Sequence, residues 1–76
     1  MPKTPVVSGA EAVRAFERLG FRIVRQRGSH VVVRKDSSEG PMGTTIPMHD
    51  QIAIGTLKGM LRQAGVAPND FWKALQ

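Results

Sequence analysis

A histidine within the most basic stretch of the chain is the side chain best suited to do chemistry. His30 follows Gly28 and Ser29, and Arg25 and Arg27 stand just before them. Histidine changes its charge near neutral pH, so its imidazole can accept or release a proton under physiological conditions. The neighbouring guanidinium groups favour an anion. The expected substrate is therefore an anion whose reaction requires proton transfer, and RNA meets both conditions.

The charge of the whole chain also favours an anionic partner. Its 76 residues include 11 Lys and Arg but only 6 Asp and Glu, which gives a formal net charge of +5. Five of the basic side chains surround the histidine, at Arg22, Arg25, Arg27, Arg34 and Lys35. A basic cluster on a small domain is typical of nucleic-acid binding, although it would also suit an acidic protein.

RNA carries its own nucleophile, the 2′-hydroxyl group. An enzyme has to deprotonate this group, align it with the scissile phosphate and stabilise the growing negative charge. A neutral imidazole on His30 could serve as the base. The predicted RNA-binding residues can hold a phosphate through guanidinium, ammonium or backbone amide groups, and they are Arg25, Arg27, Gly28, Ser29, Arg34 and Lys35. DNA, which lacks the 2′-hydroxyl, would bind to these groups without being cut.

The composition excludes several other classes of site. The chain has no cysteine, so it can form neither a disulfide nor a cysteine-based zinc site, and it fits a reducing cytoplasm. No set of His, Asp and Glu has the spacing of a metal site, and no segment is long and apolar enough to cross a membrane. We expect one domain spanning residues 1–76, with a small core, no metal ion and no cofactor.

The elements that must position His30 follow from capping signals and hydrophobic spacing. Ser8 and Glu11 form a capping box, which predicts a helix that ends at Gly20. Strands are expected over residues 21–27, 29–35 and 43–48, a loop over 36–41, and further helices over 54–64 and 68–75. Residues 1–7 are expected to form an extended lead-in without the apolar run of a signal peptide.

The order of these elements, α-β-β-β-α-α, predicts the fold class. A three-stranded antiparallel sheet would carry the helices on one face, which makes an α+β domain. This is the layout of the double-stranded-RNA-binding-domain fold. Pro47 indicates that the third strand lies at an edge of the sheet, because proline cannot donate to a central ladder.

A symmetric hairpin centred near Glu39 and Gly40 would join the second and third strands. That register pairs Val31 with Met48, Val33 with Ile46, Val32 with Pro47 and Arg34 with Thr45. It also places His30 opposite His49, with Cβ atoms about 4.5–5.5 Å apart. His49 is then a candidate for a second acid or base. The alternative is a strand-end residue that hydrogen-bonds into the following loop.

An ordered set of motifs resembles that of one known family. The motifs are Leu19-Gly20-Phe21, Gly28-Ser29-His30, Ile46-Pro47-Met48-His49, Gly55-Thr56-Leu57 and Leu61-Arg62-Gln63-Ala64-Gly65. Over nearly its full length the chain resembles the HicA toxins, small mRNA interferases of type II toxin–antitoxin modules. The resemblance implies a double-stranded-RNA-binding-domain-like fold and metal-independent RNA cleavage, with His30 as the catalytic residue. It also implies a HicB-type antitoxin that binds the toxin and blocks its active site.

The residues themselves leave two other classes of protein open. The same basic face could hold double-stranded RNA without cutting it, or could serve only an acidic protein partner. A module for double-stranded RNA typically contacts two minor grooves over about 16 base pairs, for which one basic cluster offers limited surface. A neighbouring reading frame that encodes a small antitoxin-like protein would favour the toxin.

Overall fold

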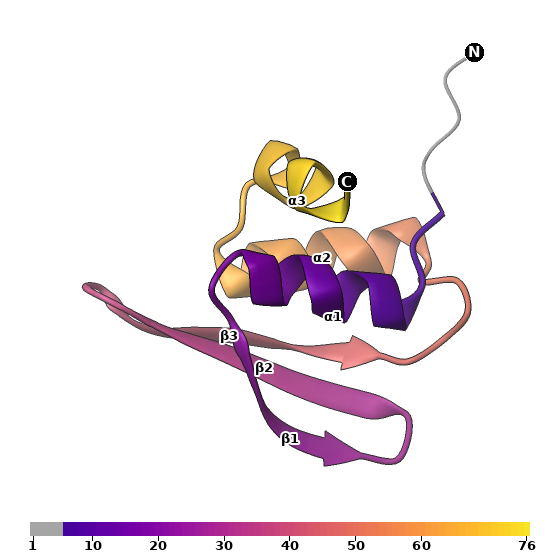
Figure 1. Cartoon of the computed structure of the whole chain (residues 1–76), viewed down its shortest axis with the longest axis horizontal. Helices are drawn as coiled ribbons and strands as arrows, with labels where there is room; N and C mark the ends of the chain where they lie inside the picture. The colour runs from indigo at the N-terminus through magenta and orange to yellow at the C-terminus, as the bar shows by residue number, and fades with distance from the viewer. Residues whose placement is uncertain (1–5) are drawn as a thin grey trace.

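The computed structural model describes residues 6–76 and contains the predicted order of elements (Figure 1). Along the chain these are α1 (Gly9–Arg18), β1 (Arg22–Arg27), β2 (His30–Ser37), β3 (Gly40–Pro47), α2 (Ile54–Ala64) and α3 (Pro68–Leu75). Residues 1–5 of the predicted lead-in lie outside the described part. Within residues 6–76, no helix has the length and apolar character that a membrane crossing requires.

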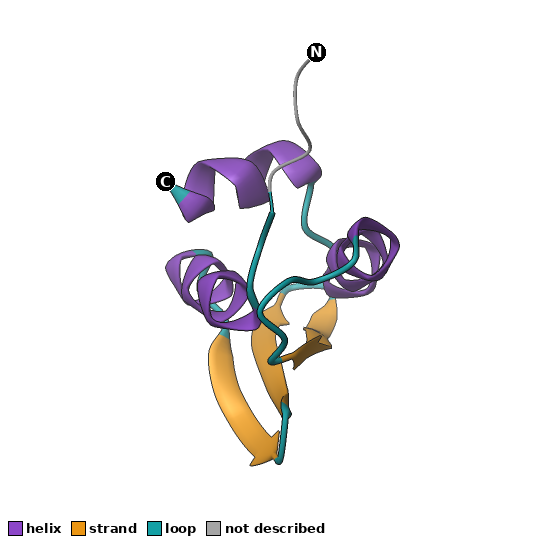
Figure 2. Cartoon of the chain, turned by 90° about the vertical axis from the view of Figure 1, so that its right-hand side faces the viewer, coloured by secondary structure: helices purple, strands orange, loops and turns teal. Residues whose placement is uncertain are grey.

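The three strands form one antiparallel sheet in the order β1-β2-β3, so β2 is central. All three helices lie on one side of the sheet, with α1 and α2 directly over it and α3 stacked above them (Figures 1 and 2). The core between these layers is built around Val31, Val33 and Ile46 from the sheet and Phe16 and Leu57 from the helices. The predicted α+β, double-stranded-RNA-binding-domain-like arrangement is confirmed, as is the edge position of the third strand.

Helix α1 begins at the predicted capping box. The Ser8 hydroxyl accepts a hydrogen bond from the Glu11 amide at 3.1 Å, and the Ser8 amide donates to the Glu11 carboxylate at 3.0 Å. Hydrogen bonding of the Glu11 carboxylate to the backbone amide of Ser8, and next to the Ser8 side chain, lowers the pKa of Glu11. At the other end of the helix, Gly20 has a φ of +96°, a left-handed conformation that turns the chain towards β1.

The register of the β2–β3 hairpin differs from the prediction by two positions. His30 lies opposite Pro47, so the predicted pairing of His30 with His49 is wrong. The other pairs shift in the same way, with Val31 opposite Ile46, Val32 opposite Thr45, Val33 opposite Thr44 and Arg34 opposite Gly43. The turn is centred on Ser38 and Glu39, and most of the loop predicted over residues 36–41 belongs to the two strands.

The side chain of Ser37 builds this turn. Its hydroxyl donates to the Gly40 carbonyl at 2.6 Å and accepts from the Glu39 amide at 3.3 Å. Because the shift is two residues, each strand keeps the same face towards the core. Thr44 lies on that face, opposite Val33, and is only 4% exposed. Its hydroxyl forms a 2.9 Å hydrogen bond with the side-chain oxygen of Gln63, which offsets the cost of burying a polar group.

Helix α3 closes the core on the side away from the sheet. Phe71 is fully buried, with its ring centroid 5.6 Å from that of Phe16 and 5.5 Å from that of Trp72. The Arg18 guanidinium donates to two carbonyl groups at the end of α3, at 2.6 and 3.2 Å, and so ties this helix to α1. Phe71 thus belongs to the core, and the partly buried Trp72 packs against it.

We expect Glu11→Gln to destabilise the protein slightly at neutral pH and to have no effect in acid. The fold lowers the pKa of Glu11, so the carboxylate form contributes stability at neutral pH. That contribution is lost as the pH falls through the lowered pKa. Thermal unfolding at neutral and acidic pH measures the difference, with Glu17→Gln, also in α1, as a control. An equal difference in melting temperature between wild type and Glu11→Gln at both pH values would contradict a stabilising role of the Glu11 carboxylate in the capping box.

Candidate active site on the open sheet face

His30 is the first residue of β2 and is held by the tight turn before it. Gly28 and Ser29 form the two-residue connection from β1, and Arg27 pairs with His30 across it. Gly28 has a φ of +53°, whereas Ser29 has no positive φ. This is the pattern of a type II′ hairpin turn with glycine at its first central position. The turn fixes the direction in which β2 starts, and with it the place of the exposed His30 side chain.

Alternation along β2 determines which side chains share a face with His30. Val31 and Val33 are buried beneath the helices, so His30 and Arg34 point to the opposite side of the sheet. Their partners on β1 lie on that same side, with Arg27 opposite His30, Arg25 opposite Val32 and Arg22 opposite Arg34. We call this helix-free side the open face. Its residues on β1 and β2 are Arg22, Arg25, Arg27, His30, Val32, Arg34 and Asp36.

A β-bulge in β1 gathers the arginines onto the open face. Arg22 and Arg25 are three residues apart, and in a regular strand they would point to opposite sides of the sheet. The register shifts between Ile23 and Arg25, which makes Val24 an extra residue and turns both arginines the same way. The bulge therefore adds Arg22 to the basic surface that Arg25, Arg27 and Arg34 form beside His30.

Little of this positive charge is compensated. The ion pair found among residues 6–76 joins the Arg22 guanidinium to the Asp36 carboxylate at 3.6 Å, and both side chains are exposed. Such a surface pair contributes only about 0–1 kcal/mol. Arg25, Arg27 and Arg34 therefore leave a positive potential near His30, which attracts anions.

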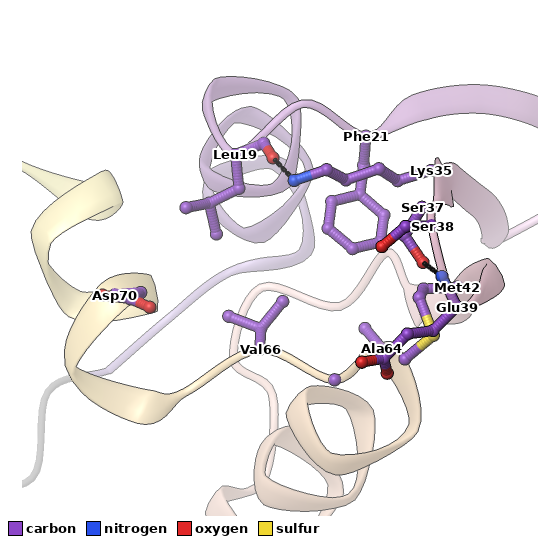
Figure 3. A pocket seen from close by; sticks show the side chains of 11 residues that line it. Leu19, Phe21, Lys35, Ser37, Ser38, Glu39, Met42, Ala64, Val66 and Asp70 are labelled. Atoms are coloured by element: carbon purple, nitrogen blue, oxygen red, sulfur yellow. Dashed lines mark hydrogen bonds between the residues drawn. The ribbon is translucent and has the colours of Figure 1, made fainter.

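Lys35 lies on the opposite face of the sheet from His30. Its ammonium group donates to the Leu19 carbonyl at 2.8 Å, at the end of α1, and sits 5.7 Å from the centre of the Phe21 ring (Figure 3). The side chains of Leu19, Phe21 and Lys35 help to line a pocket of about 370 Å³ between the β2–β3 hairpin and the helices. The structure thus separates Lys35 from the other predicted RNA-binding side chains and gives it a contact at the C-terminal end of a helix.

His49 lies near His30 although the two residues are not paired across the strands as predicted. His49 follows the end of β3, yet His30 and His49 both line one open depression of about 480 Å³. The other lining residues come from β3, the next loop and the start of α2, and they are Thr45, Pro47, Gln51, Ile52, Ala53 and Thr56. Ala53 is the N-cap residue of α2, so no side chain caps the first amides of this helix. Two imidazoles and the positive end of a helix dipole make the depression suitable for an anion.

Backbone hydrogen bonds fix the loop that carries His49. The Met48 amide donates to the Ser29 carbonyl at 2.6 Å, and the His49 carbonyl accepts from the Gly9 amide at 2.9 Å. The Ile52 amide donates at 2.8 Å to a carbonyl just before α1. The loop is therefore joined on one side to the turn that precedes β2 and on the other to the start of α1.

A comparison with models of protein families places the sequence in one family. A family model described as the HicA toxin of bacterial toxin–antitoxin matches residues 9–66, from α1 to just beyond α2. The chain belongs to the HicA toxin family. The match spans the turn before His30, the bulged strand and His49, and it ends before α3. The sequence matches none of the curated proteins with which it was compared. Residues 6–76 of this HicA toxin contain no group of three or more His, Asp and Glu side chains that could hold a metal ion.

We expect Gly9→Ala to disturb the His49 loop of this HicA toxin. A Cβ atom at position 9 would lie 2.5 Å from the Pro47 carbonyl oxygen and 2.6 Å from the Met48 Cα atom, so the backbone would have to move. The free energy of unfolding should fall by about 1–3 kcal/mol. Urea unfolding measures this loss, and the amide NMR signals of residues 47–52 should shift.

Gly59→Ala is the matched control, because a Cβ atom at this position of α2 would meet no atom within 4 Å. It should leave the loop signals unchanged and should raise stability by up to about 1 kcal/mol through better helix propensity. If both substitutions changed the stability and the loop signals equally, the close contact between the start of α1 and the loop would be ruled out.

Proposed function

We propose that this HicA-family toxin is a metal-independent endoribonuclease, an mRNA interferase, with His30 as its catalytic residue. One observation carries the proposal: the exposed imidazole of His30 shares the open face with four arginine side chains. Imidazole supplies proton transfer, and guanidinium groups bind phosphates. These are the two requirements for cleaving RNA through its own 2′-hydroxyl group.

In the proposed reaction the neutral imidazole of His30 accepts the proton of a 2′-hydroxyl group. The deprotonated oxygen bonds to the adjacent phosphorus, and the bond from phosphorus to the 5′-oxygen of the next nucleotide breaks. The departing oxygen takes up a proton, so the products carry a 2′,3′-cyclic phosphate and a 5′-hydroxyl group. Arg25 and Arg27 stabilise the negative charge that grows on the phosphoryl oxygens.

The proposed RNA-binding surface is the open face together with the turn beside it. It comprises Arg25, Arg27 and Arg34, with Gly28 and Ser29 in the turn through which a phosphate can approach the backbone. The bulge adds Arg22, which the sequence places in the basic cluster but not among the predicted binding residues. Lys35 is left out because its ammonium group contacts the end of α1 on the other side of the sheet.

We expect His30→Ala to fold normally and to cleave RNA more slowly by on the order of 10²–10⁴-fold. The side chain is exposed, so its removal costs no core packing. The assay follows cleavage of a model mRNA in excess EDTA, since the reaction scheme needs no metal ion. Growth after induced expression compares toxicity in cells. A DNA oligonucleotide with a single ribonucleotide should be cut only at that position.

Three results would count against this mechanism. Unchanged cleavage by His30→Ala at equal protein concentration would rule out the catalytic role of His30. Activity that disappears in EDTA and returns with magnesium would contradict metal independence. Wild-type protein that binds RNA without cutting it would support the alternative of a non-catalytic RNA-binding module with the same fold.

We also propose that a HicB-type antitoxin silences the toxin by covering the open face. Membership of a toxin–antitoxin family implies such a partner. The positive potential of the open face would speed the association of an acidic protein. A carboxylate of that protein near His30 would occupy the place of the scissile phosphate.

We expect Arg25→Glu to weaken binding of both RNA and the antitoxin, by roughly tenfold for RNA, with a shallower salt dependence because a phosphate contact is lost. Lys73→Glu in α3 makes the same change in net charge on the helix side of the molecule, and it should leave both affinities nearly unchanged. If Arg25→Glu, Arg27→Glu and Arg34→Glu all abolish RNA binding but leave antitoxin binding intact, the inhibitor binds elsewhere.

A further inference from the structure

We propose that His49 is the general acid of the cleavage reaction and donates a proton to the departing 5′-oxygen, while His30 acts as the base. This assignment rests on the proposed ribonuclease function and adds a second catalytic residue to it. Its basis is the presence of two exposed imidazoles, from separate segments of the chain, at one open depression.

The observed register gives the two imidazoles a spacing that suits a substrate between them. His30 lies opposite Pro47, and His49 is two residues farther on, just past the strand end. The bond from the Met48 amide to the Ser29 carbonyl extends the pairing beyond the last strand residue. Diagonal neighbours in such a ladder lie about 7–8 Å apart, with somewhat less between their Cβ atoms.

A phosphodiester held between two imidazoles needs a gap between the rings rather than direct contact. Each imidazole makes a hydrogen bond of about 3 Å to its oxygen atom, and the phosphoryl group lies between the two oxygens. Directly opposed histidines, with Cβ atoms about 5 Å apart, would instead contact each other. The register that separates His30 from His49 therefore favours a division of acid and base duties.

The lining of the depression supports the same assignment. No carboxylate is among its lining residues, so nothing there repels a phosphate. Its remaining polar side chains are hydroxyl and amide groups, which do not titrate near neutral pH. His30 and His49 are therefore the two lining groups that can transfer a proton there.

The backbone holds His49 while leaving its imidazole exposed. Its carbonyl accepts the hydrogen bond from the Gly9 amide, and the preceding amide is bonded to the residue before His30. This arrangement links the loop of one histidine directly to the turn of the other. Such preorganisation is what acid–base catalysis requires, because reacting groups must be held at hydrogen-bonding distance.

The proton transfers balance within one catalytic step. His30 removes the proton from the 2′-hydroxyl, and the resulting oxygen forms a bond to phosphorus. The bond from phosphorus to the 5′-oxygen breaks, its electron pair passes to that oxygen, and the imidazolium of His49 supplies the proton. His30 ends the step protonated and His49 neutral, and proton exchange with water restores both.

A substrate whose leaving group needs no proton tests the assignment. Replacing the bridging 5′-oxygen by sulfur gives a thiolate leaving group, which is a far weaker base than an alkoxide. We expect His49→Ala to cleave the oxygen substrate more slowly by on the order of 10²–10⁴-fold, yet to cleave the sulfur substrate within about tenfold of wild type. His30→Ala should remain defective on both substrates, because the 2′-hydroxyl still needs a base.

Asp50→Asn is the matched control, because Asp50 is exposed on the same loop and does not line the depression. Thermal unfolding checks the fold of each variant, and His49→Gln provides a second substitution. Equal losses by His49→Ala on both substrates, or no loss on either, would overturn the assignment of His49 alone. Wild-type protein that fails to cut the oxygen substrate would overturn the ribonuclease function itself.

Discussion

The two-sided role of β2 is the constraint on which the rest of the structure depends. Val31 and Val33 are 2% and 0% exposed, and a core this small cannot lose them without a large loss of stability. Since side chains alternate along a strand, burying these valines turns His30 and Arg34 to the open face. The core and the candidate active site are therefore two sides of one strand, and a one-residue slip would exchange them.

Most of the fold can be predicted because its signals are local. The capping box, the glycine that ends α1 and the spacing of apolar residues in α2 each depend on a few neighbouring residues. The β2–β3 register depends instead on where the chain turns, and residues 36–41 offer several turn formers. The hydroxyl of Ser37 decides among them by bonding to Glu39 and Gly40. The sequence also gives no sign that Gln63 will satisfy a buried Thr44.

The candidate site can be predicted in its composition but not in its arrangement. Lys35 follows the alternation of Val31 and Val33, so counting from the buried valines could have assigned it to the helix side. Arg22 and Arg25 are the opposite case, because only the bulge, which no sequence signal announces, puts them on one face. Sequence reasoning thus finds the charged residues, and backbone geometry decides which of them act together.

The clustering of arginines has a thermodynamic consequence. Four of them share the open face, and the ion pair found among residues 6–76 engages Arg22 alone. Like charges at close range repel most strongly at low ionic strength and destabilise the free protein. A ligand that brings negative charge to this face relieves the repulsion, and binding to the folded state raises stability by mass action. On the proposed function, RNA and an acidic antitoxin would both be stabilised by relieving the repulsion among these arginines. On that proposal, the same positive charge that binds phosphates also lets the carboxylates of an antitoxin silence the toxin.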